Sequence, residues 1–446
     1  MYEKYRVVVE LYTDSNPNIV ERKVIEDRTV SPVETIYDLG LRHKDQIEFL
    51  QKLQDVVLVS QSKYLREDIK FCPKCGNQVY RQGYERSKFH SVFTDHEVKT
   101  QRLHCNKCNW RSTPSIKSLF GTSIHPDLAK IQSELGATHS YRKSEKILDL
   151  HSASKRAINN HDRVKHIVSH IGMAIEAANR QSDMSNIKIA TAENLIIQVD
   201  GGHLKSVDKN ERSFEVMTSI IYKPESVGKI DSQGRGKIYN KNCSASALND
   251  KQESIKRDTL IAAVKQGMTK DTRITAVCDG ASNCWSVVEH LRPYCKTIEP
   301  ILDWFHIAMK FKNTAIPKSQ REEFDKIKWH LWHGNPEDAM DKLELIKAKI
   351  DKKHHTKIDN LIVYISNNRG YVVNYENRQN NNLVYTSNVA ESNVESLINQ
   401  RCKCQQHMIW SREGAHPVLQ VRAAIHSNEW NQSWESTVLC GLKNVA

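Results

Sequence analysis

Long hydrophobic runs and a secretory signal are both missing from this sequence of 446 residues. No apolar stretch approaches the roughly 18 residues that are needed to span a bilayer. The first residues, MYEKYRVVVELYTD, alternate apolar and polar side chains and have no basic segment followed by a small-residue cleavage site. We therefore expect a protein that has no membrane partner and stays in the cytoplasm.

Acidic residues are too few to balance the basic ones. The chain has 53 Asp and Glu against 65 Lys and Arg, which leaves a formal net charge of +12. This surplus favours a polyanionic partner such as nucleic acid, because neutralised phosphates release counterions. Internal repeats are also missing, and the length predicts roughly two to four domains rather than one core.

The eleven cysteines do not form the even, regularly spaced set that is typical of a disulfide framework. Four of them form two C-x-x-C pairs about thirty residues apart, which are Cys72 with Cys75 and Cys105 with Cys108. Two such pairs complete a tetrahedral shell for one Zn²⁺ ion. Because four thiolates leave no open position, we expect this zinc to be structural.

Residues 67–116 around these cysteines are hydrophilic and basic, with short strand-like segments, and we predict a zinc ribbon there. His90 and His96 lie between the two pairs, and we expect surface positions for them rather than a place in the zinc site. The preceding segment, residues 1–66, is predicted to be an α+β appendage with strand-like runs at Tyr5–Tyr12 and Ile19–Ile25. A capping-box pattern at Ser31–Glu34 predicts a helix start, and no function is assigned to this appendage.

Residues 117–185 are predicted to be helical and to resemble a helix-turn-helix. The segment SYRKSEKILDLH would be the first helix, and SASKRAINNHDRVKHIV would be the recognition helix that enters the major groove. In that arrangement Lys155, Arg156 and Asn159 are candidate DNA-binding residues. The alternative is an ordinary helical hairpin whose charges are solvated.

Three strand-like segments each end in an aspartate. LIIQV precedes Asp200, ITAVC precedes Asp279, and the segment from Ile298 to Leu302 precedes Asp303, which His306 follows three residues later. If these strands share a sheet, their ends bring several carboxylates together. Like charges that lie so close need a cation to stay ionised, so the pattern indicates a metal site.

A further acid is expected from the segment TSNVAESNVE. Glu391 and Glu395 lie one turn apart on a predicted helix, and the residues alone do not decide between them. Either glutamate can also belong to a solvated face. Arg401 and Lys403 follow on the same predicted helix and are further candidates for contact with DNA.

Taken together, the motifs resemble those of bacterial DDE insertion-sequence transposases of the ISKra type, which are related to Mutator-like transposases. The matching motifs are VDGG at Asp200, CDGASNCW at Asp279, LDWFHI at Asp303, SNVAES at Glu391, and the later QRCK and HMIWSREGAHPVLQVRAA. The resemblance runs from about residue 68 to residue 433.

This resemblance implies a multidomain α/β protein with an RNase H-like catalytic core. The first aspartate then lies on the first strand of a mixed sheet, the second on the fourth, and the glutamate on a late helix. Residues 190–307 and 386–440 would form the core, and residues 308–385 a mostly helical insertion. The family's spacing to Arg401 selects Glu391 rather than Glu395.

The resemblance further implies that Asp200, Asp279 and Glu391 are catalytic and hold two Mg²⁺ or Mn²⁺ ions about 4 Å apart. Asp303, His306 and Glu395 would support this site, and an equally open reading makes Asp303 and His306 a structural hydrogen-bonded pair. The expected reaction cleaves the ends of an insertion sequence and transfers the strand into target DNA. The implied partners are transposon-end and target DNA and further copies of the chain, and the location is the bacterial cytoplasm and nucleoid.

Two other functions remain open from the sequence. The chain can be a zinc-ribbon DNA-binding regulator derived from a transposase, or a metal-dependent nuclease without strand transfer. The three acids favour an enzyme over a regulator, since Asp200, Asp279 and Glu391 are all present.

Overall fold

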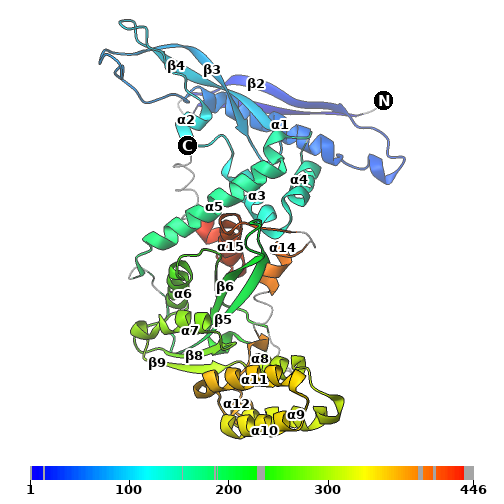
Figure 1. Ribbon diagram of the computed structural model, residues 1–446. Coiled ribbons are helices and arrows are strands. Elements are labelled where there is room, and N and C mark those ends of the chain that lie inside the picture. Colours follow the sequence, from blue (N-terminus) through cyan, green and yellow to red (C-terminus); the bar gives the residue numbers. More distant parts are fainter. Residues whose placement is uncertain are drawn as a thin grey trace. The chain divides into compact units, whose positions relative to one another are not determined.

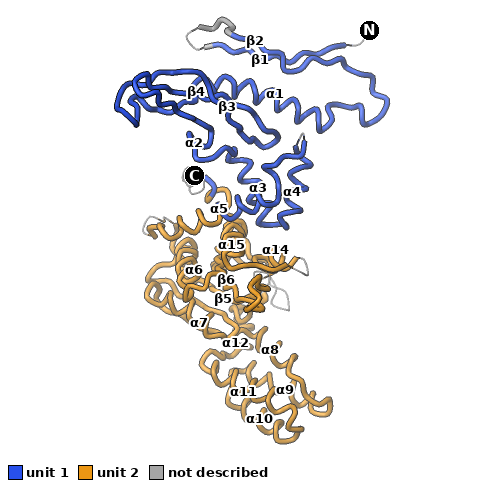
Figure 2. The backbone as a smooth tube through the Cα atoms, turned by 45° about the horizontal axis from the view of Figure 1, so that its top comes forward, with its two compact units in different colours: residues 1–170, 434–446 blue, residues 171–433 orange. Residues whose placement is uncertain are grey.

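The computed structural model describes residues 3–13, 16–152, 154–184, 187, 189–228, 237–389, 395–404 and 408–435. The chain divides into two compact units, which Figure 2 colours separately. Residues 1–170 and 434–446 make up the first unit, and residues 171–433 the second.

The first unit begins with a two-stranded antiparallel hairpin, β1 (Lys4–Thr13) and β2 (Asn16–Thr29), as the alternating N-terminal sequence predicts. The expected helix start at Ser31–Glu34 is wrong. The capping box is formed instead by Thr35 and Asp38, around a single 3₁₀ turn. The long helix α1 (His43–Ser62) starts only afterwards.

The cysteine-rich segment contains a second antiparallel hairpin, β3 (Tyr80–His90) and β4 (Asp95–His104). Helices follow it, as predicted for this part of the chain. They are α2 (Ile116–Phe120), α3 (Pro126–Thr138), α4 (Tyr141–Leu150), a 3₁₀ turn (Ala157–Asn159) and α5 (His161–Gln181).

The second unit is built on a five-stranded mixed sheet with the order β7-β6-β5-β8-β9. Its strands are β5 (Asn194–Lys205), β6 (Ser213–Tyr222), β7 (Asn242–Ser246), β8 (Arg273–Cys278) and β9 (Thr297–Leu302). β5, β8 and β9 run parallel, whereas β6 is antiparallel to β5 and to β7. Three of these five strands, β5, β8 and β9, are predicted by their apolar runs.

Helices cover both faces of the sheet, which explains why strands such as β5 and β8 are nearly continuous apolar runs. On one face, α6 (Glu253–Lys265) and α7 (Ser282–Glu289) bury alternate residues of β5 and β8, such as Ile197 and Ala276. The residue next to Ala276, Val277, points to the other face because side chains alternate along a strand. It joins a second core with Ile301 and the helices after β9.

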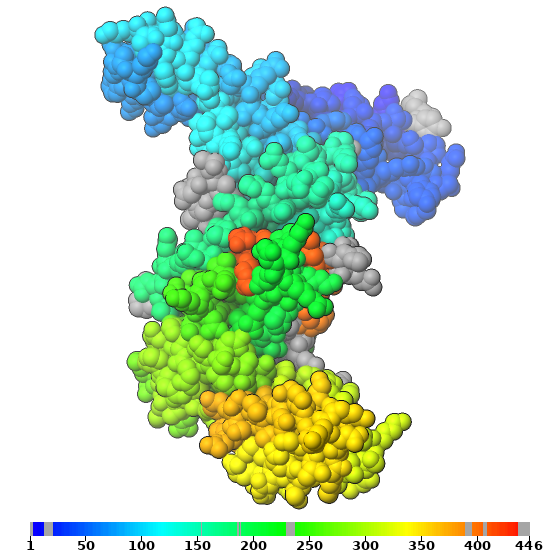
Figure 3. All heavy atoms as spheres, viewed as in Figure 1, coloured from blue at the N-terminus to red at the C-terminus, as the bar shows by residue number. Residues whose placement is uncertain are grey.

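These later helices are α8 (Trp304–Asn313), α9 (Arg321–Trp332), α10 (Pro336–Ala348), α11 (His355–Asn368) and α12 (Tyr375–Asn380). Figure 3 shows this helical segment, in yellow, gathered in one lobe. Its core is strongly aromatic, since Trp304 contacts the rings of Trp329, Trp332 and Tyr375.

The last described elements are helical and return to the sheet. They are a π-helical turn (Glu395–Asn399), α14 (Gln400–Cys402), α15 (Arg412–His426) and α16 (Trp430–Ser433). α15 packs against β7, where Gln420 donates a hydrogen bond to the backbone oxygen of Ala245. Figure 1 shows α15 and α14 near the strand labels β5 and β6. Throughout the described ranges, no helix combines the length and the apolar character that crossing a membrane requires.

Candidate functional site

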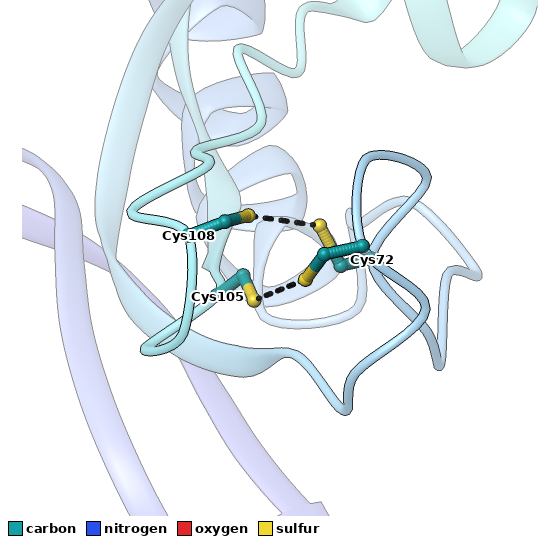
Figure 4. A group of neighbouring side chains, drawn as sticks. Cys72, Cys105 and Cys108 are labelled. Carbon is teal, nitrogen blue, oxygen red and sulfur yellow. Dashed lines mark hydrogen bonds between the residues drawn. The ribbon is translucent and has the colours of Figure 1, made fainter.

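The four paired cysteines converge on one point of the first unit. The sulfur atoms of Cys72 and Cys108 lie 3.5 Å apart, as do those of Cys75 and Cys105. Figure 4 shows the labelled members of this group turned toward one another. Four sulfurs bound tetrahedrally at about 2.3 Å from one zinc ion lie roughly 3.8 Å apart, so the cluster matches such a site in size.

The two cysteine turns repeat each other residue by residue. Each C-x-x-C pair is followed by a residue with positive φ, Gly76 at 72° and Asn109 at 56°. Glycine and asparagine are the residues that tolerate this left-handed conformation best. Hydrogen bonds from the backbone and side chain of Asn77 lower the pKa of Cys75 to about 6, whereas burial and the neighbouring thiols raise the pKa of Cys108 to about 12. Of these two cysteines, Cys75 therefore more readily forms the metal-binding thiolate.

His90 and His96, which lie between the cysteine pairs, each pair with an aspartate, and neither joins the cysteine cluster. His96 is buried and its Nδ1 lies 2.6 Å from a carboxylate oxygen of Asp55 on α1. The expectation of a surface position is therefore wrong for His96. His90 is half-buried and pairs with Asp95 at 2.8 Å.

In the second unit, the parallel strands place the three aspartates at one edge of the sheet. Val199 of β5 pairs with Cys278 of β8, and Cys278 pairs with Leu302 of β9. The next residue of each strand is an acid, so Asp200, Asp279 and Asp303 follow this aligned row. The register therefore explains why three carboxylates separated widely in sequence meet.

Asp200 does not end its strand as expected. β5 continues through Gly201 and Gly202 to Lys205 because β6 still pairs with it, whereas pairing with β8 stops at Val199. Burial raises the pKa of Asp200, and the charges of Asp279 and Asp303 add to that effect against the opposing influence of His306 and the Gly201 amide. A bound cation would relieve this repulsion.

Asp279 lies in a turn that residues of α11 contact. The hydroxyl of Tyr364 on α11 donates a hydrogen bond of 2.9 Å to the backbone oxygen of Asp279. Gly280 follows at φ +94°, and a side chain there would meet the amide of Asn368 at 2.9 Å. Neither Tyr364 nor Asn368 is predicted from the sequence, since nothing local marks a helix residue that contacts a distant turn.

Asp303 is buried and fully engaged in hydrogen bonds. Its two oxygens accept from the amides of Phe305 and Ser387, from the Ser387 hydroxyl at 2.6 Å, and from Nδ1 of His306 at 2.6 Å. Burial alone would raise the pKa of Asp303, but the hydrogen bonds and the charge of His306 outweigh it and lower that pKa. Asp303 is thus an ionised partner of His306.

His306 belongs to the acidic cluster directly. Ligand atoms of Asp200, Asp279 and His306 all lie within 4.8 Å of one another, a grouping that can hold a divalent metal ion. Burial alone would lower the pKa of His306, but the hydrogen bond and charge of Asp303 and the charges of Asp200 and Asp279 raise it. With Nδ1 bound to Asp303, Nε2 is the nitrogen left for a metal ion or a phosphate.

The expected third acid, Glu391, lies outside the described residues. Glu395 is described: it opens the π-helical turn, is exposed, and accepts a hydrogen bond of 2.8 Å from the Asn399 amide. It is not a member of the cluster of Asp200, Asp279 and His306.

The candidate DNA-binding residues near the predicted recognition helix do not present one exposed surface. Arg156 is buried and binds Asp95 together with the backbone oxygens of Ser91, Val92 and Thr94. Asn159 is buried as well, and only Lys155 is exposed. The helix also begins later than expected, at His161, because Ser154 to Asn160 form a loop and a 3₁₀ turn.

Of the two DNA-binding candidates later in the sequence, one is buried and the other is exposed. Arg401 is fully buried, with its guanidinium 5.0 Å from the ring centre of Trp410, so it packs inside the unit rather than on its surface. Lys403 is exposed. The sequence does not distinguish these neighbours, because only the fold decides which side of a short helix is covered.

Comparison with solved structures finds weak likeness to a transposase complex. The Drosophila P element transposase strand transfer complex matches with a TM-score of 0.30 and 7% sequence identity, over 69% of this chain and 94% of that one. At this level of likeness, only the residues of the site bear on function. No curated protein sequence matches the chain significantly. The sequence profile of the uncharacterised protein family UPF0236 matches residues 122–436, and the chain belongs to this family.

Proposed function

We propose that the chain is a DNA transposase that cleaves insertion-sequence ends and joins them to target DNA. One observation carries this proposal: Val199, Cys278 and Leu302 pair in one row across three parallel strands, and residues just after this row bring Asp200, Asp279 and His306 within 4.8 Å. Carboxylate oxygens are the ligands that Mg²⁺ and Mn²⁺ prefer.

In this proposal Asp200, Asp279 and Glu391 hold two divalent ions, and His306 contributes from the same edge of the sheet. When bound, the ions activate water or a DNA 3′-hydroxyl and stabilise the leaving oxygen. Asp303 keeps the His306 ring in one orientation, and Tyr364 fixes the turn of Asp279. Lys310 adds an exposed positive charge beside them, 4.2 Å from the ring centre of Tyr364.

The proposal includes an RNase H-like core made of residues 190–307 and 386–440, with 308–385 as an inserted helical domain. It is supported by the mixed sheet, in which Asp200 lies on the first strand and Asp279 follows the fourth. The run of helices α9 to α12 supports the inserted domain. The ribbon of residues 67–116 then holds one structural zinc and contributes to DNA binding.

The test is incubation of the purified chain with Mg²⁺ and the DNA that flanks its gene, followed by detection of cleaved and joined strands. Asp200→Asn, Asp279→Asn and Glu391→Gln should each abolish both products and leave DNA binding intact, because an amide keeps the shape but removes the charge. Asp271→Asn, an exposed acid on the loop before β8, is the matched control and should stay active. Glu395→Gln should also keep most of its activity.

The products separate the proposal from its competitors. Cleavage without joining would indicate a nuclease, and DNA binding without either product would indicate a regulator. If Glu391→Gln remains active and Glu395→Gln is dead, the glutamate is misassigned by one helical turn.

A further inference from the structure

A hollow of about 390 Å³ in the first unit lies between the ribbon and the start of α5. Its walls come from β3, from α2 with the following residues 121–124, from the 3₁₀ turn before α5, and from the first half of α5. Figure 1 shows these elements in the same part of the unit. On α5, Arg163, His166, Ile167 and His170 recur at intervals of three and four residues, so one face of the helix lines the hollow.

Six lining side chains are basic or can become so, and none of the lining residues is acidic. They are Lys88, His90, Lys117, Arg163, His166 and His170. Within the described part of the chain, only His90 of these six has an acidic partner, which is Asp95. By contrast, two basic residues of the β3–β4 hairpin outside the hollow have acidic partners, Arg86 with Glu97 and Arg102 with Glu85. Positive charge is therefore concentrated here without compensation.

One buried nitrogen in the lining of the hollow has no hydrogen-bond partner within the described residues. Nε2 of His170 is buried, and no described residue hydrogen-bonds to it. Burial lowers the pKa of His170, and the charge of His166 lowers it further. An oxygen-rich anion would satisfy this nitrogen and offset the repulsion between the neighbouring cations.

The lining indicates which kind of anion fits. Thr122 and Ser123 offer hydroxyl groups, whereas no Phe, Tyr or Trp lines the hollow, so it provides no platform for stacking a base. Lys, Arg, Ser and Thr side chains are those that typically contact the DNA backbone. Of the lining residues, Lys88, Lys117, Arg163 and His166 are exposed, so an extended polyanion can reach them.

We propose that this hollow binds phosphate groups of the DNA backbone, with Lys88, Lys117 and Arg163 as the principal contacts. This inference rests on the proposed function and gives it a defined DNA contact in the first unit. It moves that contact from the loop of Arg156, which is buried in structural hydrogen bonds, to the first half of α5. The hollow positions DNA without reading its sequence, since phosphates are the same at every base pair.

The test measures binding of the full-length, zinc-loaded chain to a fluorescent duplex DNA over a range of salt concentrations, with Mg²⁺ omitted so that no cleavage occurs. Loss of one phosphate contact flattens the slope of log K against log salt by about 0.9. Lys117→Gln and Arg163→Gln should each show this flattening together with weaker binding. Lys165→Gln is the matched control, because Lys165 is exposed on the same helix but does not line the hollow.

If both hollow variants keep the slope of Lys165→Gln while the unmodified chain binds DNA, the phosphate site is refuted and the proposed function stands. If the unmodified chain does not bind duplex DNA, both are refuted. The zinc content of each variant, measured in parallel, shows that the ribbon is intact.

Discussion

Nδ1 of His306 donates a hydrogen bond of 2.6 Å to Oδ2 of the buried Asp303, which two groups of Ser387 also bind. This pairing fixes the ring beside Asp200 and Asp279. Carboxylates that orient a metal-binding histidine in this way raise its basicity and its affinity for the ion. Asp303 therefore acts on the candidate metal site through His306.

Replacing Asp303 tests that relationship. Asp303→Asn should lower the affinity for Mn²⁺ by about 10–100-fold, the usual effect of removing such an orienting group. Calorimetric titration of the variant and of the control Asp271→Asn would measure the difference. Equal Mn²⁺ affinity in both variants would show that the pair has only a structural role.

Tyr364 should matter for activity although it lies on the helical lobe. Tyr364→Phe removes only the hydrogen bond to the Asp279 backbone, which is worth about 0.5–1.5 kcal/mol. We expect single-turnover cleavage to slow by up to about tenfold, with the fold preserved. Tyr294→Phe, at an exposed tyrosine of the same unit, is the control. A rate equal to that of the control would contradict the proposed support of the Asp279 turn.

The cysteine cluster should bind one zinc ion per chain. Cys72→Ser should lose the metal, and because zinc-binding energy is folding energy, it should also unfold the ribbon. Cys404→Ser, which changes an exposed cysteine outside the cluster, should retain the zinc. Elemental analysis of the purified proteins measures this, and a full zinc content in Cys72→Ser would rule the site out.

Arg156 should stabilise the ribbon rather than bind DNA. Arg156→Met removes the hydrogen bonds that the buried guanidinium donates to Asp95 and to backbone oxygens of the β3–β4 turn, and should cost about 1–3 kcal/mol locally. Hydrogen exchange of the β3–β4 turn amides in the full chain should become much faster. Lys155→Met should leave exchange unchanged, because Lys155 is exposed. Slow exchange in Arg156→Met would contradict this role.

The sequence predicts those parts of the fold that a short stretch of neighbouring residues determines. The apolar runs of β5, β8 and β9 mark buried strands, and the expected sharing of one sheet correctly brings Asp200 and Asp279 together. The cysteine spacing likewise predicts a four-sulfur cluster, because a turn of that length places two thiols side by side.

Distant partners explain what the sequence does not predict. β7 is made of small and polar residues, NCSAS, and is buried because other segments satisfy it: Ser244 donates to the backbone of Asp258, and Ser427 accepts from the amide of Cys243. Arg156 looks like a surface charge until its partners around Asp95 are known. No period of two or 3.6 residues carries this information.

The central claim is that Asp200 and Asp279 hold divalent metal ions, and electron paramagnetic resonance of Mn²⁺ tests it most directly. Free Mn²⁺ gives a strong signal that is lost on binding, so a titration counts the bound ions. We predict that the unmodified chain and Asp271→Asn take up Mn²⁺, whereas Asp200→Asn and Asp279→Asn do not. Uptake by both of these site variants as tight as that of the unmodified chain would contradict the claim.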